Sequence, residues 1–255
     1  MLDSITTVIF DLDGTLYCGD LPVKNAAYTV AKLREIGLKI LFLTNNSVKT
    51  RKQIRNKLLK MEIQCREDEI FTSGYTAALY AKYNNLTNIY ICGTENLHEE
   101  FKNANVSLCG SDLAENLVIG YDPDFSYTKL SEAFSVALNA KHVIACNKER
   151  YFPGNNNKLL PGCAAMVTPI EYCAKRQADI IVGKPHTLML ELICREHNLK
   201  PNQILTVGDT YESDILMAQK FGCKNAYFNR DYDKEKYPAD IHLDELSRLC
   251  TYFHN

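Results

Sequence analysis

The sequence contains no long hydrophobic segment and has almost no net charge. No apolar run approaches the roughly 20 residues that a membrane-spanning helix needs. The 29 basic and 31 acidic residues leave a formal net charge of −2, so there is no basic excess of the kind that indicates nucleic-acid binding. The chain enters an apolar run at Val8, which leaves no room for a signal peptide. We therefore expect a cytoplasmic protein that binds neither nucleic acid nor a membrane.

Several binding motifs are also missing. The ten cysteines include no C-x-x-C pair, and no two histidines lie three to five positions apart, which argues against a structural zinc site. We expect reduced thiols that pack as small hydrophobic groups. Neither G-x-G-x-x-G nor a Walker A motif occurs, so the usual phosphate loops of nucleotide-binding proteins are excluded.

The composition is ordinary for a globular protein, and its pattern predicts an α/β fold. Of the 255 residues, 46% are hydrophobic, enough for a sizeable core. Apolar runs alternate with segments of helical periodicity, which is typical of a doubly wound parallel sheet. We expect strands at 8–10, 38–43, 70–71, 88–93, 116–120, 142–146, 180–184, 204–209 and 226–228, the last of them the final core strand. Helices are expected at 24–36, 50–61, 73–83 (capped by Ser73), 95–104, 126–139, 163–175, 187–197 and 214–221.

Two aspartates end the first apolar run. The segment Thr7–Leu16 reads T-V-I-F-D-L-D-G-T-L, and its apolar part is typical of a strand buried on both faces. Asp11 ends the run and Asp13 follows two positions later, so both carboxylates should project to the same side. Two such carboxylates repel each other unless a cation lies between them. A turn with two solvated aspartates is the alternative, but D-x-D-G-T is too specific a pattern to favour it.

Polar groups follow three later apolar runs. They are Thr44, Asn45 and Asn46 after 38–43, Lys184 at the end of 180–184, and Asp209 at the end of 204–209, with Asp214 five positions on. Each has a structural alternative: a capping turn for Thr44 and Asn45, a solvated turn lysine for Lys184, and a helix N-cap for Asp214. Open parallel sheets bind ligands at the carboxyl ends of their strands, so we expect these groups to lie together at one edge of one sheet.

This set of side chains suits phosphoryl transfer. Asp11 can attack phosphorus and form an aspartyl-phosphate, while Asp13 can protonate the leaving oxygen and later accept a proton from water. Carboxylates are suitable ligands for Mg²⁺, and Asp209 would supply a third one. Lys184 would offset the negative charge and hold the phosphoryl group. Thr44 and the backbone amides around Asn45 and Asn46 would bind its remaining oxygens.

The four motifs resemble those of the haloacid dehalogenase superfamily, and the resemblance covers the whole chain. They are D-L-D-G-T-L from Asp11, T-N-N from Thr44, G-K-P around Lys184 and G-D-T-Y-E-S-D from Gly208 to Asp214. The resemblance implies a nucleophilic Asp11 and a general acid/base at Asp13. It also implies Mg²⁺ bound by Asp11, the backbone carbonyl of Asp13 and Asp209, with a more distant or water-mediated contact from Asp214.

Two details of these motifs refine the expected activity. Dehalogenases of the superfamily lack the second aspartate, so Asp13 favours a phosphatase that acts on small phosphorylated metabolites. Many relatives carry arginine where this chain has Thr210. That departure leaves the expected metal ligands intact and puts the local loop contacts in doubt.

The spacing of the motifs predicts a second domain. The first two motifs are too close for an inserted domain, whereas the interval from Asn46 to Lys184 exceeds what core elements need. We expect a catalytic core at 1–78 and 179–255 and a smaller inserted α/β cap domain at 79–178. Such a cap resembles the type IIA, NagD-like or p-nitrophenylphosphatase-like subfamily. That resemblance implies a possible homodimer through the cap.

The segment 147–162 has no helical or strand periodicity, and we expect it to be a loop that selects the substrate. Its candidate contacts are Asn147, Tyr151 and Phe152, which can stack on a ring or hydrogen-bond a polar metabolite. The alternative is that the two aromatic side chains only pack the loop onto its own domain.

Two other functions are compatible with the same fold. A phosphotransferase or mutase could use the same aspartyl-phosphate, but the usual mutases carry a helical cap between the first two motifs, where this chain has no space. A non-catalytic sensor of phosphorylated metabolites is the third possibility. The intact set of Asp11, Asp13, Lys184 and Asp209 argues against it.

Overall fold

The computed structural model describes residues 2–153, 158–229, 233 and 235–253. It divides into two compact units. The first comprises Met1–Thr44, Lys52–Phe71 and Lys184–Asn255, and the second comprises Asn45–Arg51 and Thr72–Gly183. The range expected for the cap, 79–178, lies inside the second unit. The short segment Asn45–Arg51 also belongs to that unit, which the motif spacing did not predict.

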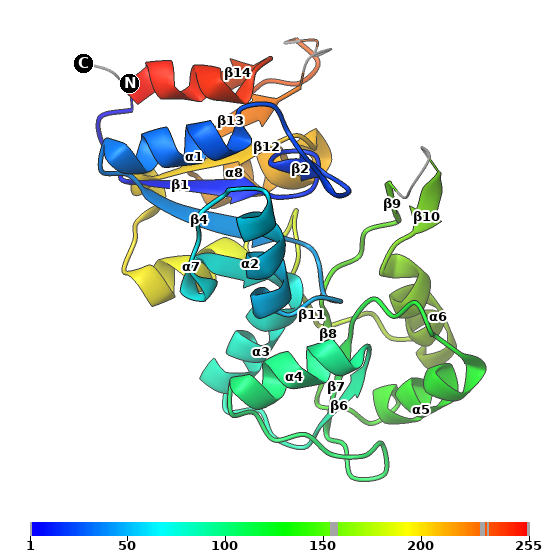
Figure 1. The fold of residues 1–255 in the computed structure, drawn as a ribbon. Coiled ribbons are helices and arrows are strands. Elements are labelled where there is room, and N and C mark those ends of the chain that lie inside the picture. Colours follow the sequence, from blue (N-terminus) through cyan, green and yellow to red (C-terminus); the bar gives the residue numbers. More distant parts are fainter. Residues whose placement is uncertain (1, 154–157, 230–232, 234, 254–255) are drawn as a thin grey trace. The chain divides into compact units, whose positions relative to one another are not determined.

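The first unit is built on a six-stranded sheet with β1 (Thr7–Asp11) in its interior (Figure 1). All five residues of β1 are buried, as expected for a strand covered on both faces. It pairs in parallel with β12 on one side and β4 on the other. The order is β14 (Ile241–Leu243), β13 (Lys224–Phe228), β12 (Ile204–Gly208), β1, β4 (Lys39–Thr44) and β5 (Ile70–Thr72).

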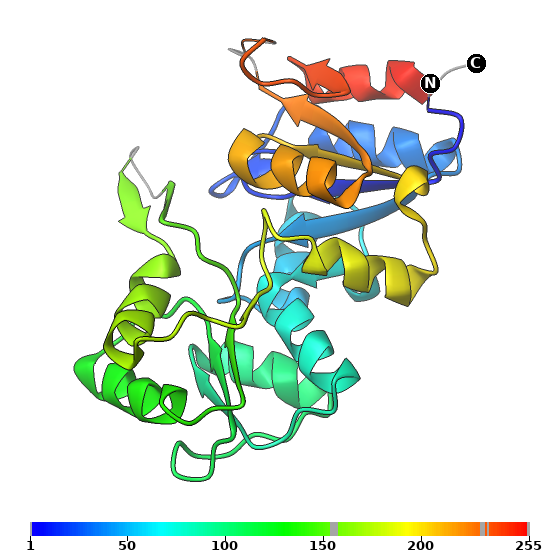
Figure 2. The ribbon, with the colours of Figure 1, turned by 180° about the vertical axis from the view of Figure 1, so that it is seen from behind.

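Helices cover both faces of this sheet (Figures 1 and 2). On one face, α1 (Ala26–Glu35), α2 (Arg51–Lys60) and the 3₁₀ segment Leu246–Phe253 pack on Val8, Phe10 and Phe42. The opposite face is covered by α7 (Leu188–His197) and α8 (Leu216–Phe221). This is the doubly wound α/β arrangement that the alternating pattern predicted. A short hairpin, β2 (Tyr17–Cys18) and β3 (Leu21–Pro22), follows the first motif.

The second unit has a parallel sheet of its own, in the order β11 (Ile180–Ile181), β8 (His142–Ala145), β7 (Asn116–Ile119) and β6 (Ile89–Cys92). On one face lie α3 (Ser73–Tyr83) and α4 (Glu95–Asn103). On the other lie α5 (Tyr127–Ala137) and α6 (Ala164–Ala174), which pack on Leu117 and Ile119. No helix among the described residues is both long and apolar enough to cross a bilayer.

One strand joins a different sheet from the one expected. The run 180–184 forms only the two-residue strand β11, which pairs with β8 in the second unit. Lys184 therefore does not end a strand of the first sheet, and the expectation that four strand ends share one sheet edge was wrong. An apolar run predicts burial but carries no information about its pairing partner. A Cβ on Gly183 would lie 2.5 Å from Asn45 Oδ1, so the backbone is tightly packed where the strand ends.

The expected loop 147–162 also contains structure. Tyr151–Pro153 (β9) and Leu159–Pro161 (β10) pair as antiparallel strands, with Phe152 beside Leu160. Residues 154–157 lie outside the described part of the chain. Three-residue strands are too short to show a periodicity of two, which is why the sequence pattern predicted only a loop.

Two predicted boundaries and one structural alternative were wrong in detail. Thr72, and not Ser73, caps α3, because its Oγ1 accepts a hydrogen bond from the Tyr75 amide at 2.9 Å. Asp214 does not cap a helix, since it lies inside a π-helical turn, Tyr211–Ile215, that precedes α8. The strand at 226–228 is not the last of the core, because β14 pairs with its outer edge.

Candidate active site

Three carboxylates converge beside the centre of the first sheet. Asp11 is the last residue of β1, and Asp209 follows β12 directly. These strands are parallel neighbours with Phe10 beside Val207, so both acids leave the sheet at the same edge. The π-helical turn after Asp209 brings Asp214 to them. One carboxylate oxygen from each of the three lies within 4.8 Å of the others.

Lys184 joins the cluster from outside the sheet. Its Nζ donates to Asp11 Oδ1 at 2.5 Å and to Asp214 Oδ1 at 2.6 Å. Lys184, Asp11 and Asp214 are all buried, so a solvated turn lysine is excluded. One ammonium group faces three carboxylates, which leaves an excess of two negative charges.

Burial and repulsion act on the protonation of these groups. Desolvation raises the pKa of Asp11 well above its usual range, and the charges of Asp214 and Asp209 raise it further, against the opposing effect of Lys184. Desolvation and the charge of Asp214 likewise raise the pKa of Asp209 to about 6. Burial alone would lower the pKa of Lys184, but Asp11 and Asp214 more than offset this and raise it. The cluster is thus short of positive charge.

Hydrogen bonds hold the acids in place. Thr15 Oγ1, which is fully buried, donates to Asp209 Oδ1 at 2.9 Å. The Thr210 amide donates to Asp214 Oδ2 at 3.1 Å, so the position that is arginine in many relatives contributes its backbone here. Gly14 adopts φ +92°, and a Cβ at this position would collide with the carboxylate of Asp209. The third acid can approach the first motif only because residue 14 is glycine.

Asp13 and Thr44 flank the cluster. Asp13 lies two positions after Asp11, and the side chain of Leu12 between them is fully buried in the core. Unlike Asp11, Asp13 is exposed to solvent. Thr44 ends β4 next to the first strand, where Asp11 pairs with Leu43, and it is buried. Both residues therefore leave the sheet at the same edge as Asp11.

The predicted residues Asn45 and Asn147 lie together in the second unit. Asn147 Nδ2 donates to the Asn45 carbonyl at 2.7 Å, and Ser73 Oγ donates to the same oxygen at 2.7 Å. Asn45 Nδ2 in turn donates to Glu149 Oε1 at 2.9 Å. The turn after Thr44 is thus attached to the start of the β9–β10 segment. The side chain of Asn147 has a structural role here, and its contact with a substrate stays a prediction.

Asn46 caps the next turn. Its Oδ1 accepts hydrogen bonds from the amides of Val48 at 3.0 Å and Lys49 at 2.8 Å. The capping alternative therefore applies to this side chain. Binding of phosphate by the backbone amides around Asn45 and Asn46 stays a prediction.

The two aromatic candidates on β9 differ in their surroundings. The Tyr151 side chain is 60% exposed. The Phe152 ring packs edge-on against Tyr121, with the ring centroids 5.4 Å apart. The contact with Tyr121 gives the Phe152 ring a packing role within the second unit. Tyr151 has the exposure that a ligand contact requires.

Sequence reasoning missed three contributors to these sites. Thr15 stands inside the D-x-D-G-T motif, and the fixed letter was the available signal. Thr210 was noted only as a departure from relatives. Glu149 had no sequence signal, because its contact with Asn45 spans about a hundred positions of the chain.

The donor set of the first unit fits Mg²⁺. Hard divalent cations prefer carboxylate oxygens and need few protein ligands. Asp11 and Asp209 provide such oxygens, and the excess of two negative charges matches a divalent ion. Both oxygens of Asp214 accept protein hydrogen bonds, which suits a role behind the direct ligands.

Comparison with known proteins agrees with this geometry. Residues 8–107 match the model for haloacid dehalogenase-like hydrolases, and residues 181–237 match a second model described as HAD-hydrolase-like. The chain therefore belongs to the haloacid dehalogenase-like hydrolase family. Within it, the chain is an enzyme of the phosphoric monoester hydrolase class, as the motifs predicted.

Three phosphatases illustrate the similarity of this chain to known proteins. The chain is 33% identical to a sugar-phosphatase, AraL, of Bacillus subtilis, over 94% of this chain and 90% of the relative. It is 30% identical to phosphoglycolate phosphatase 2 of Arabidopsis thaliana, over 88% of this chain and 82% of the relative. The fold matches the solved structure of a p-nitrophenyl phosphatase from Archaeoglobus fulgidus with a TM-score of 0.92, at 23% identity over 98% and 99% of the two chains. The predicted likeness to p-nitrophenylphosphatase-type proteins is thus confirmed.

Proposed function

We propose that this chain is a magnesium-dependent phosphatase of small phosphorylated metabolites that acts through an aspartyl-phosphate on Asp11. The observation that supports this most is the convergence of Asp11, Asp209 and Asp214 on one ammonium group. An acid cluster with an uncompensated double negative charge is unfavourable in a buried position. A cation and a phosphoryl group bound at the carboxyl edge of the sheet would explain why these acids lie together there.

In the first step, an Asp11 carboxylate oxygen attacks phosphorus and the ester P–O bond breaks. Asp13 donates its proton to the leaving oxygen. Lys184 keeps Asp11 oriented through the 2.5 Å contact and offsets the charge on the phosphoryl oxygens. Asp11, the backbone carbonyl of Asp13 and Asp209 would hold Mg²⁺, which would supply positive charge to offset the negative charge on the transferred group.

In the second step, water attacks phosphorus and the acyl phosphate bond to Asp11 breaks. Asp13, now a carboxylate, accepts a proton from that water. Inorganic phosphate leaves, and Asp11 is regenerated as a carboxylate. The solvent exposure of Asp13 supports this role, because the residue must exchange protons with substrate and water.

The relatives support a class of substrates. A sugar-phosphatase and a phosphoglycolate phosphatase share most of this chain's length, so we infer a small phosphorylated sugar or organic acid. In this proposal 79–178 acts as the cap, with β9 and β10 as the element that selects the leaving group. The cap would also be the surface of a homodimer.

The test is the release of phosphate from a panel of phosphorylated sugars and acids. Asp11→Asn keeps the size of the side chain and removes the nucleophile, so turnover should fall at least about a thousandfold. The exposed Glu196→Gln on α7 is the matched control and should retain activity. A folded Asp11→Asn protein that releases phosphate at near wild-type rates would sink the assignment.

A further inference from the structure

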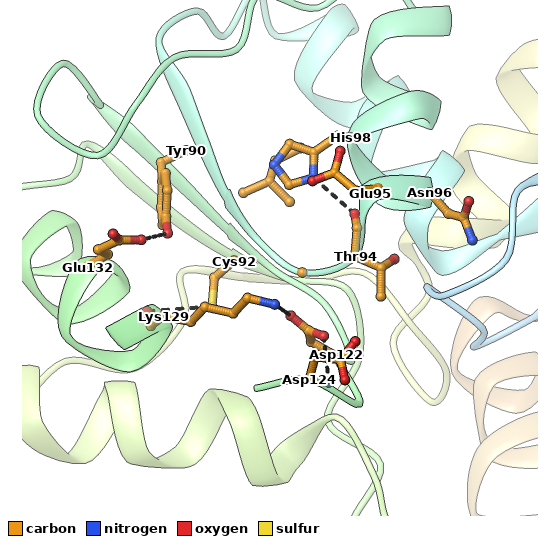
Figure 3. Close-up of a pocket in the computed structure, with 12 residues that line it drawn as sticks. Tyr90, Cys92, Thr94, Glu95, Asn96, His98, Asp122, Asp124, Lys129 and Glu132 are labelled. Carbon is orange, nitrogen blue, oxygen red and sulfur yellow. Dashed lines mark hydrogen bonds and ion pairs between the residues drawn. The ribbon is translucent and has the colours of Figure 1, made fainter. Parts of the chain in front are cut away.

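The second unit contains a cavity of about 450 Å³ that the proposed chemistry does not use (Figure 3). It lies at the carboxyl ends of β6 and β7. Its walls come from the turn after β6, the first turn of α4, the turn after β7, and α5. All of its lining residues belong to the second unit.

The position of the cavity is a topological switch point of the sheet. From β6 the chain passes through α4 and returns beside the outer edge of β6, where Leu108 bridges to Ile89. From β7 the chain passes through α5 to β8, on the other side of β7. Helices α4 and α5 cover opposite faces of the sheet. Open parallel sheets bind ligands in the crevice where neighbouring strands lead away in opposite directions.

The walls of the cavity carry an excess of acids. Four carboxylates line it, and its single lysine, Lys129, is already paired with the buried Asp122 at 2.6 Å. Lys129 also lies close enough to Asp124 to feel its charge, so one ammonium group serves two of the four carboxylates and the cavity keeps an excess of acids. The amino end of α4 contributes only about half a positive charge, so the cavity keeps a strongly negative potential.

The other polar groups of the cavity are mainly acceptors. His98 Nδ1 lies 2.9 Å from the Thr94 carbonyl, which can only accept, so this nitrogen is the donor of that hydrogen bond and is not available to a ligand. Thr94 Oγ1 is shielded from solvent, and no described group is its hydrogen-bond partner. The Tyr90 hydroxyl donates its hydrogen bond to Glu132 Oε2 at 2.6 Å. A ligand that supplies several donors and positive charge would satisfy this lining.

The acids surround the cavity instead of meeting at one point. Figure 3 shows Glu132 beside Tyr90 on one side, and Glu95 and Asp124 on other sides of the space. Among the described residues, the group of acids close enough for one metal ion is the one formed by Asp11, Asp209 and Asp214. The cavity therefore fits a molecule with separated positive charges better than a bare cation.

We propose that this cavity binds a small aliphatic diamine or polyamine. One protonated nitrogen is held by Glu132 against the ring of Tyr90, where a cation–π contact adds to the charge. A second nitrogen meets Asp124 or Glu95 at another wall. The site is separate from the proposed phosphatase chemistry and does not depend on it.

The experiment measures spermidine and 1,4-diaminobutane binding to the full chain by calorimetry, with uncharged 1,4-butanediol as the matched probe. Both amines should bind, the diol should not, and affinity should fall as salt is raised. Glu132→Gln keeps an acceptor for Tyr90 and removes one charge-assisted contact, so spermidine binding should weaken roughly tenfold. Glu99→Gln, on the exposed side of α4 outside the cavity, is the control and should bind as the wild type does.

Other results would overturn the proposal. They are the absence of amine binding, equal binding of the diol, or equal affinity in the Glu132→Gln and Glu99→Gln proteins. Amine binding that is lost in Asp11→Asn and kept in Glu132→Gln would assign the amine to the first unit instead. None of these readouts requires phosphatase activity, so they stand apart from the test of the proposed function.

Discussion

At the scale of single residues, the site depends on contacts that orient its acids. Lys184 holds Asp11 and Asp214 directly, and Thr15 holds Asp209. Hydrogen bonds to metal-ligating carboxylates fix their orientation and tune their affinity. The contact from Thr15 is the one that can be removed without changing a charge or a volume.

Thr15→Val should weaken Mg²⁺ binding. The valine keeps the shape of the threonine but cannot donate to Asp209 Oδ1, a loss of about 1 kcal/mol and hence about fivefold in affinity. Calorimetric titration with Mg²⁺ measures this directly, and saturating Mg²⁺ should restore most of the turnover. Thr206→Val, at a buried threonine of β12 whose hydroxyl donates to the Lys224 carbonyl at 3.4 Å, should leave Mg²⁺ affinity unchanged. Equal affinities in the two variants would show that Thr15 does not position the ligand.

At the scale of secondary-structure elements, the sequence pattern did not predict the antiparallel strands β9 and β10, which the structure contains. Tyr151 is exposed on it, and Phe152 packs on Tyr121. The start of this segment is attached through Glu149 to Asn45. In the proposed function this element would present side chains to the leaving group, because a site for the phosphoryl group would contact only what all substrates share.

Phe152→Ala should therefore change the ratio of kcat/KM between bulky and small substrates severalfold. Hydrolysis of acetyl phosphate, which has a minimal leaving group, should stay nearly unchanged. Tyr172→Ala on α6, whose side chain is 84% exposed, serves as the control. If Phe152→Ala lowers all substrates uniformly, or alters no ratio, the ring supports the fold and does not select the substrate.

At the scale of the whole molecule, the acid cluster lowers the stability of the metal-free protein. The pKa of Asp209 is raised to about 6 by burial and by Asp214, so the folded state binds more protons than the unfolded state. Stability is then lost as pH rises from the unfolded value near 4 through about 6. Above that range the penalty is complete.

Asp209→Asn should stabilise the metal-free protein at neutral pH, by on the order of 2 kcal/mol. The gain should be absent near pH 4 and grow until about pH 7, when unfolding by urea is compared with the wild type. Mg²⁺ should raise the wild-type unfolding temperature and leave that of Asp209→Asn almost unchanged, because a ligand stabilises only the state that binds it. A gain that is independent of pH would contradict the electrostatic cause.

The sequence by itself determined the elements and the catalytic candidates. Buried strands and amphipathic helices are encoded by local periodicity, so most elements were predicted within a few residues. Asp11, Asp13 and Asp209 stand next to buried runs or within local motifs. Asp11 ends β1 and Asp209 follows β12, so both had to leave the sheet at one edge once those strands were parallel neighbours.

Only the tertiary structure decided which segments far apart in the chain pair with each other. It placed Ile180–Ile181 in the second sheet, added β14 beside β13, and assigned Asn45–Arg51 to the second unit. It also brought Glu149 to Asn45 and assembled the acid-lined cavity from the ends of β6 and β7. Strand pairing and side-chain contact depend on packing between residues far apart in the chain. The periodicity of a single segment carries information about its burial and none about its neighbours.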